Sequence, residues 1–258
     1  MDLLFKNSLF VVCGASSGFG RAIAETLLKE NASIIAVARR EEKLNELRSI
    51  APDRCEIITG DVTQTDTHDN IIEVIGKRPL TGLVLNSGGP PPGPAETTGA
   101  EDWDDAYQNV FRWKTELTRR ALPLLKQAAY GRILFVESQS VKQPIANLAQ
   151  SNAMRAAVAG YAKTLSQEVA GDGITVNLLA PGSHNTPAIE RVIRSRMESW
   201  NVSYEEARNR MEANVPVGRF GEAEELASLA AWLLSGHSGY VTGQVISHDG
   251  GNIAGMFG

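Results

Sequence analysis

The sequence predicts an α/β protein built on one doubly wound (Rossmann) seven-stranded parallel sheet with helices on both faces. Short apolar runs rich in Val and Ile recur along the chain, as is typical of strands buried on both faces. Amphipathic stretches of helical period separate these runs, and crossovers of this length imply right-handed βαβ units. With 258 residues, 43% of them hydrophobic, the chain is expected to form a single domain, 1–258.

The predicted elements alternate along the whole chain. Gly20–Lys29 places Ile23, Leu27 and Leu28 on one helical face, and Arg155–Ala170 repeats apolar residues in the same way. The predicted strands are Leu9–Cys13, Ser33–Ala38, Glu56–Val62, Gly82–Ser87, Gly131–Ser138, Ile174–Ala180 and Gln244–Ser247.

Two segments interrupt this alternation. Gly88–Pro94 contains three consecutive prolines, which lack N–H donors, so it is neither a helix nor a central strand. We expect either a rigid wall of the substrate pocket or a loop with a purely structural role. Pro187–Asn214 is charged and helical in pattern, and it is expected to form a lid inserted over a site.

Composition and charge exclude several classes of protein. The net charge of −5 argues against a nucleic acid or an anionic membrane as partner. No apolar run approaches the length of about 18 residues that spans a membrane, and the N-terminus has no signal-peptide pattern. Cys13 and Cys55 are expected to be small core residues in a reducing compartment, and no metal site is predicted. We therefore expect a cytoplasmic protein.

A glycine-rich turn joins the first strand to the first helix. Its GxxxGxG spacing lets the backbone turn sharply and approach a pyrophosphate closely, and the helix N-terminus supplies free N–H groups. Glycine-rich turns also occur without ligands, but this position in an alternating fold favours a dinucleotide. The residues predicted to contact the cofactor here are Gly14, Ser16, Ser17, Gly18, Phe19 and Gly20.

Further motifs follow the loop in a fixed order, and with it they carry a family resemblance. They are Gly60 to Val62, Asn86, Asn109, Ser138, Pro181 with Gly182, and the C-terminal stretch 240–251. In these motifs the chain resembles the short-chain dehydrogenase/reductase family, and within it the 3-oxoacyl-acyl-carrier-protein reductases, over nearly its whole length. The resemblance implies further cofactor contacts at Asp61 and Val62 (adenine), Asn86, Ser87 and Gly88 (adenosine ribose), and Pro181, Gly182 and Thr186 (nicotinamide).

The end of the second predicted strand bears on the choice of cofactor. Members of the family that use NAD carry an acidic residue there, whereas this chain has Arg39 and Arg40. Two guanidinium groups suit a 2′-phosphate, so NADP is favoured over NAD. The alternative is a pair of solvated arginines at the start of a helix.

The catalytic positions depart from the family pattern. The resemblance implies a Tyr and a Lys at YxxxK spacing, but the aligned positions here hold Ser151 and Arg155. Asn109 and Ser138 are retained, and Ser138 lies the expected 13 residues before Ser151. An aliphatic hydroxyl is a much poorer acid than a phenol, and a guanidinium essentially never deprotonates. Arg155 could still bind the ribose hydroxyls of the cofactor.

The proton donor and the function consequently stay open. Lys142, His184 and Tyr107 are candidate donors, and each also has a purely structural interpretation. We expect an NADP(H)-dependent oxidoreductase that interconverts a carbonyl and a secondary alcohol, acting on a small-molecule or acyl-carrier-type substrate. The alternative is a protein that binds the dinucleotide without turnover. The apolar C-terminal run 250–258 and the resemblance imply a homodimer or homotetramer.

Overall fold

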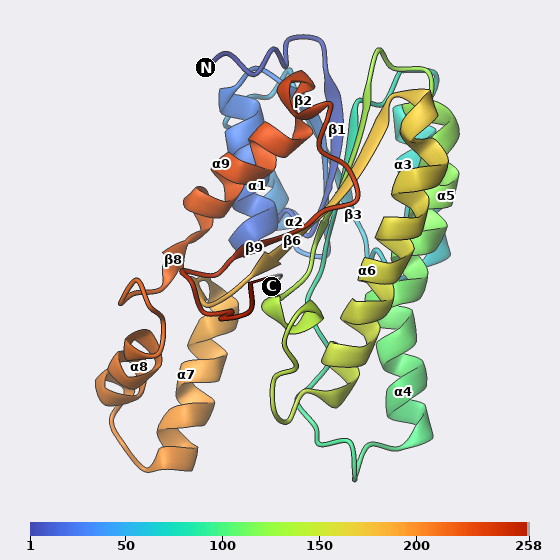
Figure 1. Cartoon of the computed structure of the whole chain (residues 1–258). Coiled ribbons are helices and arrows are strands. Elements are labelled where there is room, and N and C mark those ends of the chain that lie inside the picture. Colours follow the sequence, from blue (N-terminus) through green and yellow to red (C-terminus); the bar gives the residue numbers. More distant parts are fainter. Residues whose placement is uncertain (257–258) are drawn as a thin grey trace.

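The computed structural model describes residues 1–256, and it contains the predicted parallel sheet (Figure 1). The strands lie in the order β3-β2-β1-β4-β5-β6-β9, and every neighbouring pair is parallel. Their bounds are β1 (Leu9–Cys13), β2 (Ser33–Ala38), β3 (Cys55–Thr59), β4 (Gly82–Asn86), β5 (Gly131–Val136), β6 (Ile174–Pro181) and β9 (Val245–His248). The predicted fold class is confirmed, and both cysteines are buried and free as predicted.

Helices cover both faces of the sheet and enclose one apolar core on each side. One core packs β-strand residues against α1 (Gly18–Lys29), α2 (Glu41–Arg48) and α9 (Ala223–Leu234), and α1 lies beside α9 (Figure 1). The opposite core lies under α3 (Thr65–Ile75), α5 (Trp113–Leu125) and α6 (Ala149–Val169). The short helix α4 (Ala100–Ala106) continues into a π-helical segment, Tyr107–Arg112, before α5 begins.

The sheet reverses its winding direction between two central strands, β1 and β4. The chain moves outward from β1 through β2 to β3, and it then returns to β4 and continues toward β9. In open α/β sheets, ligands bind in the crevice outside the carboxyl ends of the strands at this point. The glycine-rich loop follows β1 directly, and Asn86 ends β4. The fold therefore brings the predicted cofactor residues to one edge of the sheet.

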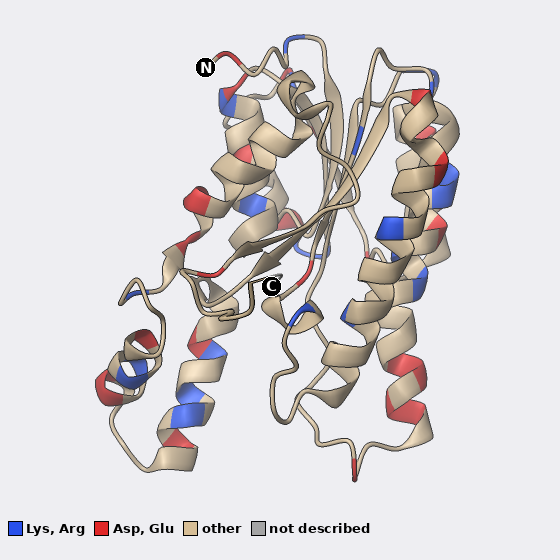
Figure 2. Ribbon diagram, viewed as in Figure 1, with Lys and Arg blue, Asp and Glu red and all other residues tan. Residues whose placement is uncertain are grey.

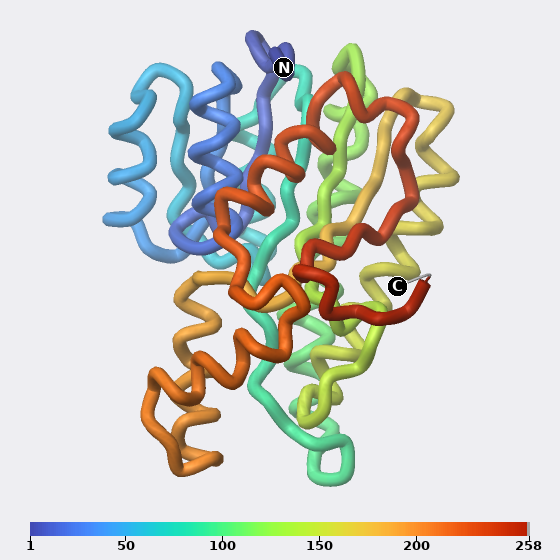
Figure 3. The backbone as a smooth tube through the Cα atoms, turned by 60° about the vertical axis from the view of Figure 1, so that its left-hand side comes forward, coloured from blue at the N-terminus to red at the C-terminus, as the bar shows by residue number. Residues whose placement is uncertain are grey.

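The segment predicted to be a lid forms two helices that pack on each other. These are α7 (Pro187–Trp200) and α8 (Tyr204–Ala213), and a small apolar cluster around Ile193 and Phe220 joins them. Figure 3 shows both helices projecting beyond the edge of the sheet. A two-stranded sheet of β7 (His184–Asn185) and β8 (Gly221–Glu222) closes the base of the segment. The role of this segment as a lid stays a prediction.

The remaining parts of the chain bear on the other predictions. Residues 88–94 form neither a helix nor a regular strand, as predicted, and Gly93 makes only an isolated bridge to Leu148. Of the C-terminal run 250–258 that was assigned to a subunit interface, residues 257 and 258 lie outside the described residues. No helix within residues 1–256 is long and apolar enough to cross a bilayer. Figure 2 shows both signs of charge interspersed on the outer helices.

Candidate active site

The glycine-rich loop lies directly against the end of β4. Gly14 has a φ of +68°, and a Cβ atom there would lie 2.6 Å from Asn86 Nδ2. A Cβ atom on Gly20 would collide with the Gly14 carbonyl oxygen, so both positions require glycine. The N-cap residue Ser17 makes no side-chain capping bond, which leaves the first N–H groups of α1 available to a ligand. The loop therefore fits a phosphate group.

The two arginines after β2 take different positions. Arg40 Nη2 donates hydrogen bonds to Ser17 Oγ (2.7 Å) and Ser16 Oγ (3.0 Å), so its guanidinium is held over the glycine-rich loop. The Arg39 side chain is 80% exposed, and its Nη1 lies 3.9 Å from Asp61 Oδ2. Arg40 is therefore the better placed of the two to meet a phosphate at this loop.

The predicted nicotinamide edge meets the same loop from the other side. The Phe19 ring packs edge-on against His184, with 5.0 Å between ring centroids. His184 Nδ1 lies 3.0 Å from the Gly182 carbonyl oxygen, and its Nε2 lies 2.8 Å from His248 Nδ1. Burial lowers the pKa of His184. Both ring nitrogens are thus engaged within the protein, which favours the structural interpretation of His184 over that of a proton donor.

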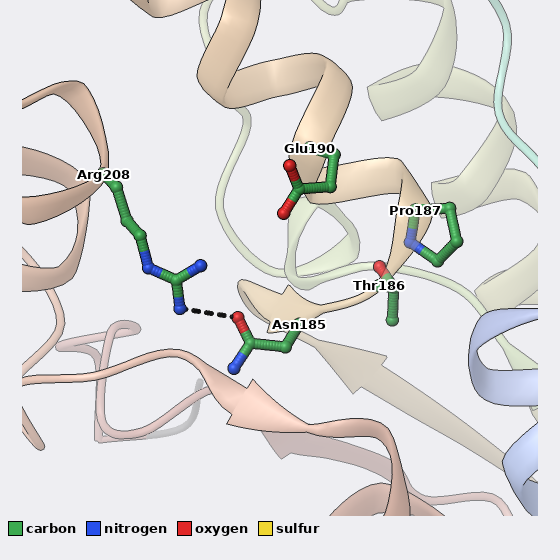
Figure 4. A pocket seen from close by; sticks show the side chains of 5 residues that line it. All are labelled: Asn185, Thr186, Pro187, Glu190 and Arg208. Carbon is green, nitrogen blue, oxygen red and sulfur yellow. Dashed lines mark hydrogen bonds between the residues drawn. The ribbon is translucent and has the colours of Figure 1, made fainter. Parts of the chain in front are cut away.

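An open pocket of about 590 Å³ begins at Thr186 and extends toward α7 and α8 (Figure 4). Arg208 from α8 reaches across it and donates a hydrogen bond of 2.8 Å to Asn185 Oδ1. Glu190 and Pro187 from the first turns of α7 complete the lining. The predicted nicotinamide contact Thr186 therefore lines a space bordered by residues of α7 and α8.

The predicted catalytic positions come together on α6. Arg155 Nε donates a hydrogen bond of 3.1 Å to Ser151 Oγ, one helical turn earlier. The loop after β4 lies close by, because a Cβ atom on Gly89 would lie 2.9 Å from Arg155 Nη2. Ser138 caps a short 3₁₀ helix after β5, and its Oγ accepts a hydrogen bond of 3.2 Å from Ser140 N.

Two charged residues that the sequence analysis missed complete this cluster. Glu137 Oε2 accepts a hydrogen bond of 2.8 Å from Arg155 Nη1, and Glu137 Oε1 accepts one from Lys114 Nζ. The side chains of Lys114 and Glu137 are fully buried, with 0% exposure. A signal was present in the sequence. Glu137 directly follows an apolar strand, and Lys114 lies on the helical face that also carries Leu117 and Ala121.

Comparison with known proteins identifies the family. The family model described as enoyl-(acyl carrier protein) reductase matches residues 14–252, which is nearly the whole chain. The chain belongs to the short-chain dehydrogenase/reductase family. Among curated members, the NADPH-dependent reductase BacG of Bacillus subtilis is 31% identical over 255 residues, which cover 96% of this chain and 98% of BacG.

Solved structures of family members match the fold closely. The L-sorbose reductase of Gluconobacter frateurii, solved with NADPH and L-sorbose, has a TM-score of 0.93 at 27% identity, and the match covers 99% of this chain and 100% of that one. A short-chain oxidoreductase of Pseudomonas aeruginosa with bound NADPH, described as containing an atypical catalytic center, has a TM-score of 0.85 at 28% identity. That match covers 96% of this chain and 97% of the other.

Three further candidates, Asn109 from the family pattern and the alternative donors Tyr107 and Lys142, belong to segments outside α6. Asn109 is an exposed residue of the π-helical segment, and its carbonyl oxygen accepts a hydrogen bond of 3.1 Å from Trp113 Nε1. Tyr107, on the same segment, is 42% exposed. Lys142 is half-buried on the loop after Ser138, and burial lowers its pKa. A catalytic role for any of these three stays a prediction.

Proposed function

We propose that this protein is an NADPH-dependent reductase that converts a carbonyl group to a secondary alcohol. The observation that carries the proposal is that the end of β4 and the loop after it, from Asn86 to Gly89, adjoin both the glycine-rich loop and α6. The Arg40-capped phosphate loop and the Ser151–Arg155 pair lie at the same edge of the sheet, on either side of the loop after β4. The NADPH-dependent reductase BacG and the L-sorbose reductase with bound NADPH, both similar over nearly the full length, support this assignment.

The residues fit the parts of a dinucleotide. The amides at the start of α1 would hold the pyrophosphate, and Arg40 would hold the 2′-phosphate. When bound, the reduced nicotinamide supplies a hydride to the carbonyl carbon. The remaining contacts proposed are Asp61 and Val62 for the adenine, Asn86, Ser87 and Gly88 for its ribose, and Pro181, Gly182 and Thr186 for the nicotinamide.

Two serine hydroxyls would polarise the substrate carbonyl. Ser138 Oγ already accepts a hydrogen bond from Ser140 N, and Ser151 Oγ accepts one from Arg155 Nε. Each hydroxyl therefore keeps its own hydrogen for donation to the substrate oxygen. Neither is a good acid, so the altered pair Ser151 and Arg155 would act by hydrogen bonding and charge rather than by fast proton transfer. The alkoxide left by hydride transfer would then take its proton from solvent water.

A second function is supported by the same departure. A protein that binds the dinucleotide without turnover would keep the phosphate loop and would not need a tyrosine acid. One experiment distinguishes the two functions. A panel of aldehydes, ketones and 3-oxoacyl thioesters is added to purified protein with NADPH, and oxidation of the NADPH is measured. Oxidation with any of these compounds supports the reductase. Tight NADPH binding without oxidation supports the second function.

Ser138→Ala is expected to lower the turnover number by about 100-fold to 1,000-fold, the usual loss when one donor to a developing oxyanion is removed. NADPH affinity should change little, because the proposed partner of this hydroxyl is the substrate oxygen. Steady-state kinetics and fluorescence titration measure the two quantities. Ser228→Ala, an exposed serine on α9, is the matched control. Equal turnover of the Ser138 variant and this control would contradict the assignment.

Arg40→Ala is expected to weaken NADPH binding by about tenfold or more while leaving NADH binding nearly unchanged. The loss corresponds to one or two charge-assisted hydrogen bonds to the 2′-phosphate. Arg39→Ala should cost less, because the Arg39 side chain extends into solvent. Fluorescence titration of each protein with NADPH and with NADH measures these affinities. Equal affinities for NADPH and NADH in the unmodified protein would show that Arg40 does not bind a 2′-phosphate.

A further inference from the structure

A chain of buried charges ties α5 to α6 through the residue that follows β5. Lys114 Nζ donates to one carboxylate oxygen of Glu137, and Arg155 Nη1 donates to the other at 2.8 Å. Arg155 Nε in turn donates to Ser151 Oγ at 3.1 Å. The Arg155 side chain is 9% exposed, so the whole chain of contacts is nearly closed to water.

Such a cluster is costly to bury. Each charge loses its hydration, and replacing a buried ion pair or triad with well-packed apolar residues is often neutral or stabilising. Stability alone therefore gives no reason for three charges at this place. Their position gives a functional reason, because Glu137 directly precedes Ser138 in the sequence and the last hydrogen bond of the cluster is made to Ser151.

The hydrogen bonds of the cluster orient the groups that would face the substrate. Both Glu137 oxygens are occupied, so the carboxylate cannot rotate without breaking a contact to Lys114 or Arg155. Arg155 Nη2 makes no hydrogen bond within residues 1–256, and it lies against the Gly89 backbone, where a Cβ atom would be 2.9 Å away. The Nη2 group of Arg155 is therefore available to donate a hydrogen bond beside Ser151, and the contact with Glu137 fixes the direction in which it points.

The cluster also carries an excess of positive charge. The titratable groups that face Lys114 are Glu137, which follows β5, Arg155 from α6 and Cys13 from β1. Burial raises the pKa of the Cys13 thiol to about 12, so this thiol is neutral at physiological pH. The Trp113 ring centroid lies 5.6 Å from Lys114 Nζ. When Lys114 is protonated, two cations and one carboxylate leave one positive charge, which favours negative charge developing on a nearby oxygen.

We infer that Lys114 and Glu137 are positioning residues that fix Arg155 and Ser151 for polarisation of the substrate carbonyl. This inference rests on the proposed reductase function. Lys114 holds the Glu137 carboxylate in place, Glu137 holds the Arg155 guanidinium, and Arg155 orients the Ser151 hydroxyl. Ser151 and Arg155 occupy the two positions where the family pattern implies Tyr and Lys.

The test measures single-turnover oxidation of prebound NADPH by an accepted carbonyl substrate, across the whole pH range in which the protein stays folded. Lys114→Met is expected to lower this rate by about tenfold or more, the loss for one charge-assisted hydrogen bond. Lys114→Met leaves Glu137 paired with Arg155, so the variant should fold and bind NADPH normally. Lys126→Met is the matched control, because Lys126 follows the end of the same helix and belongs to an exposed ion pair with Asp172.

The pH dependence separates positioning from a merely structural role. Burial lowers the pKa of Lys114 below the ordinary lysine value, so its ammonium is lost as pH rises through that lowered pKa. The rate of the unmodified protein and of Lys126→Met should fall as pH rises through this lowered pKa, before an ordinary lysine would lose its proton. Lys114→Met should be slow throughout and lack this decline. Glu137→Asp keeps the negative charge on a side chain that is one methylene group shorter. It should lower the rate without changing NADPH affinity.

Each outcome bears on a different claim. If the unmodified protein turns over and Lys114→Met matches it, or shows the same decline of the rate with rising pH, the positioning role is overturned while the reductase function stands. If the unmodified protein binds NADPH but oxidises it with no carbonyl compound, the proposed function fails and the positioning role falls with it. A slow, pH-independent Lys114→Met with normal NADPH affinity supports both.

Discussion

Glu137→Gln is expected to lower the free energy of unfolding by about 3–5 kcal/mol, the usual cost of leaving buried charges without their partner. Glu137 is the only carboxylate that the described structure pairs with the buried Lys114 and Arg155. Its removal leaves the fully buried Lys114 and the nearly buried Arg155 without a negatively charged partner. The effect should be much larger than that of Lys114→Met, because Glu137 and Arg155 then still neutralise each other.

Thermal or urea unfolding followed by circular dichroism measures this difference. For a chain of this size the loss corresponds to a melting temperature lowered by roughly 6–20 °C. A triple variant, Lys114→Met with Glu137→Gln and Arg155→Met, removes all three charges and should recover much of the stability. Equal melting temperatures for Glu137→Gln and Lys114→Met would mean that charge pairing within the cluster does not determine the stability of these variants.

Introducing Ser151→Tyr and Arg155→Lys together is expected to raise turnover of simple ketones by about 100-fold to 10,000-fold, the usual contribution of general acid catalysis. The two positions are in contact in the structure, 3.1 Å apart between Ser151 Oγ and Arg155 Nε. A phenol beside an ammonium can be tuned toward neutral pH, whereas a serine hydroxyl cannot. Glu137 would keep the new ammonium protonated.

Neither single substitution should give this gain, because the phenol needs the cation and the cation alone has no acid to tune. The measurement is steady-state NADPH oxidation by unmodified, single and double variants, with NADPH affinity as the check on folding. The expectation fails if the unmodified protein already reduces simple ketones faster than about 1 per second, the low end for working enzymes. Another group would then be the acid.

The sequence predicted the fold because the signals for it are local and repeated. Strands such as Leu9–Cys13 and Ser33–Ala38 are apolar throughout, and the structure buries nearly all of their residues. The loop after β1 was equally predictable from the sequence. Gly14 and Gly20 occupy backbone positions where any Cβ atom would collide with neighbouring atoms, so glycine is required there. These features depend on residues close together along the chain.

The internal arrangement of the site could not be predicted in the same way. Lys114 and Arg155 lie 23 and 18 residues from Glu137 along the chain, and only the packing of α5 and α6 on β5 unites them. Arg39 and Arg40 are adjacent in sequence, yet only Arg40 turns toward the loop. Asn109 lies on a π-helical segment, where the phase of side chains departs from the ordinary helical period.

The two ends of the segment that carries α7 and α8 meet at one point. His184 in β7 lies so close to Gly221 in β8 that a Cβ atom on this glycine would be 2.6 Å from the imidazole, and His248 holds the same ring from β9. Residues between these anchors can therefore change in number and kind without altering the register of the main sheet. The sheet that carries the glycine-rich loop can thus be inherited intact while this segment varies during evolution.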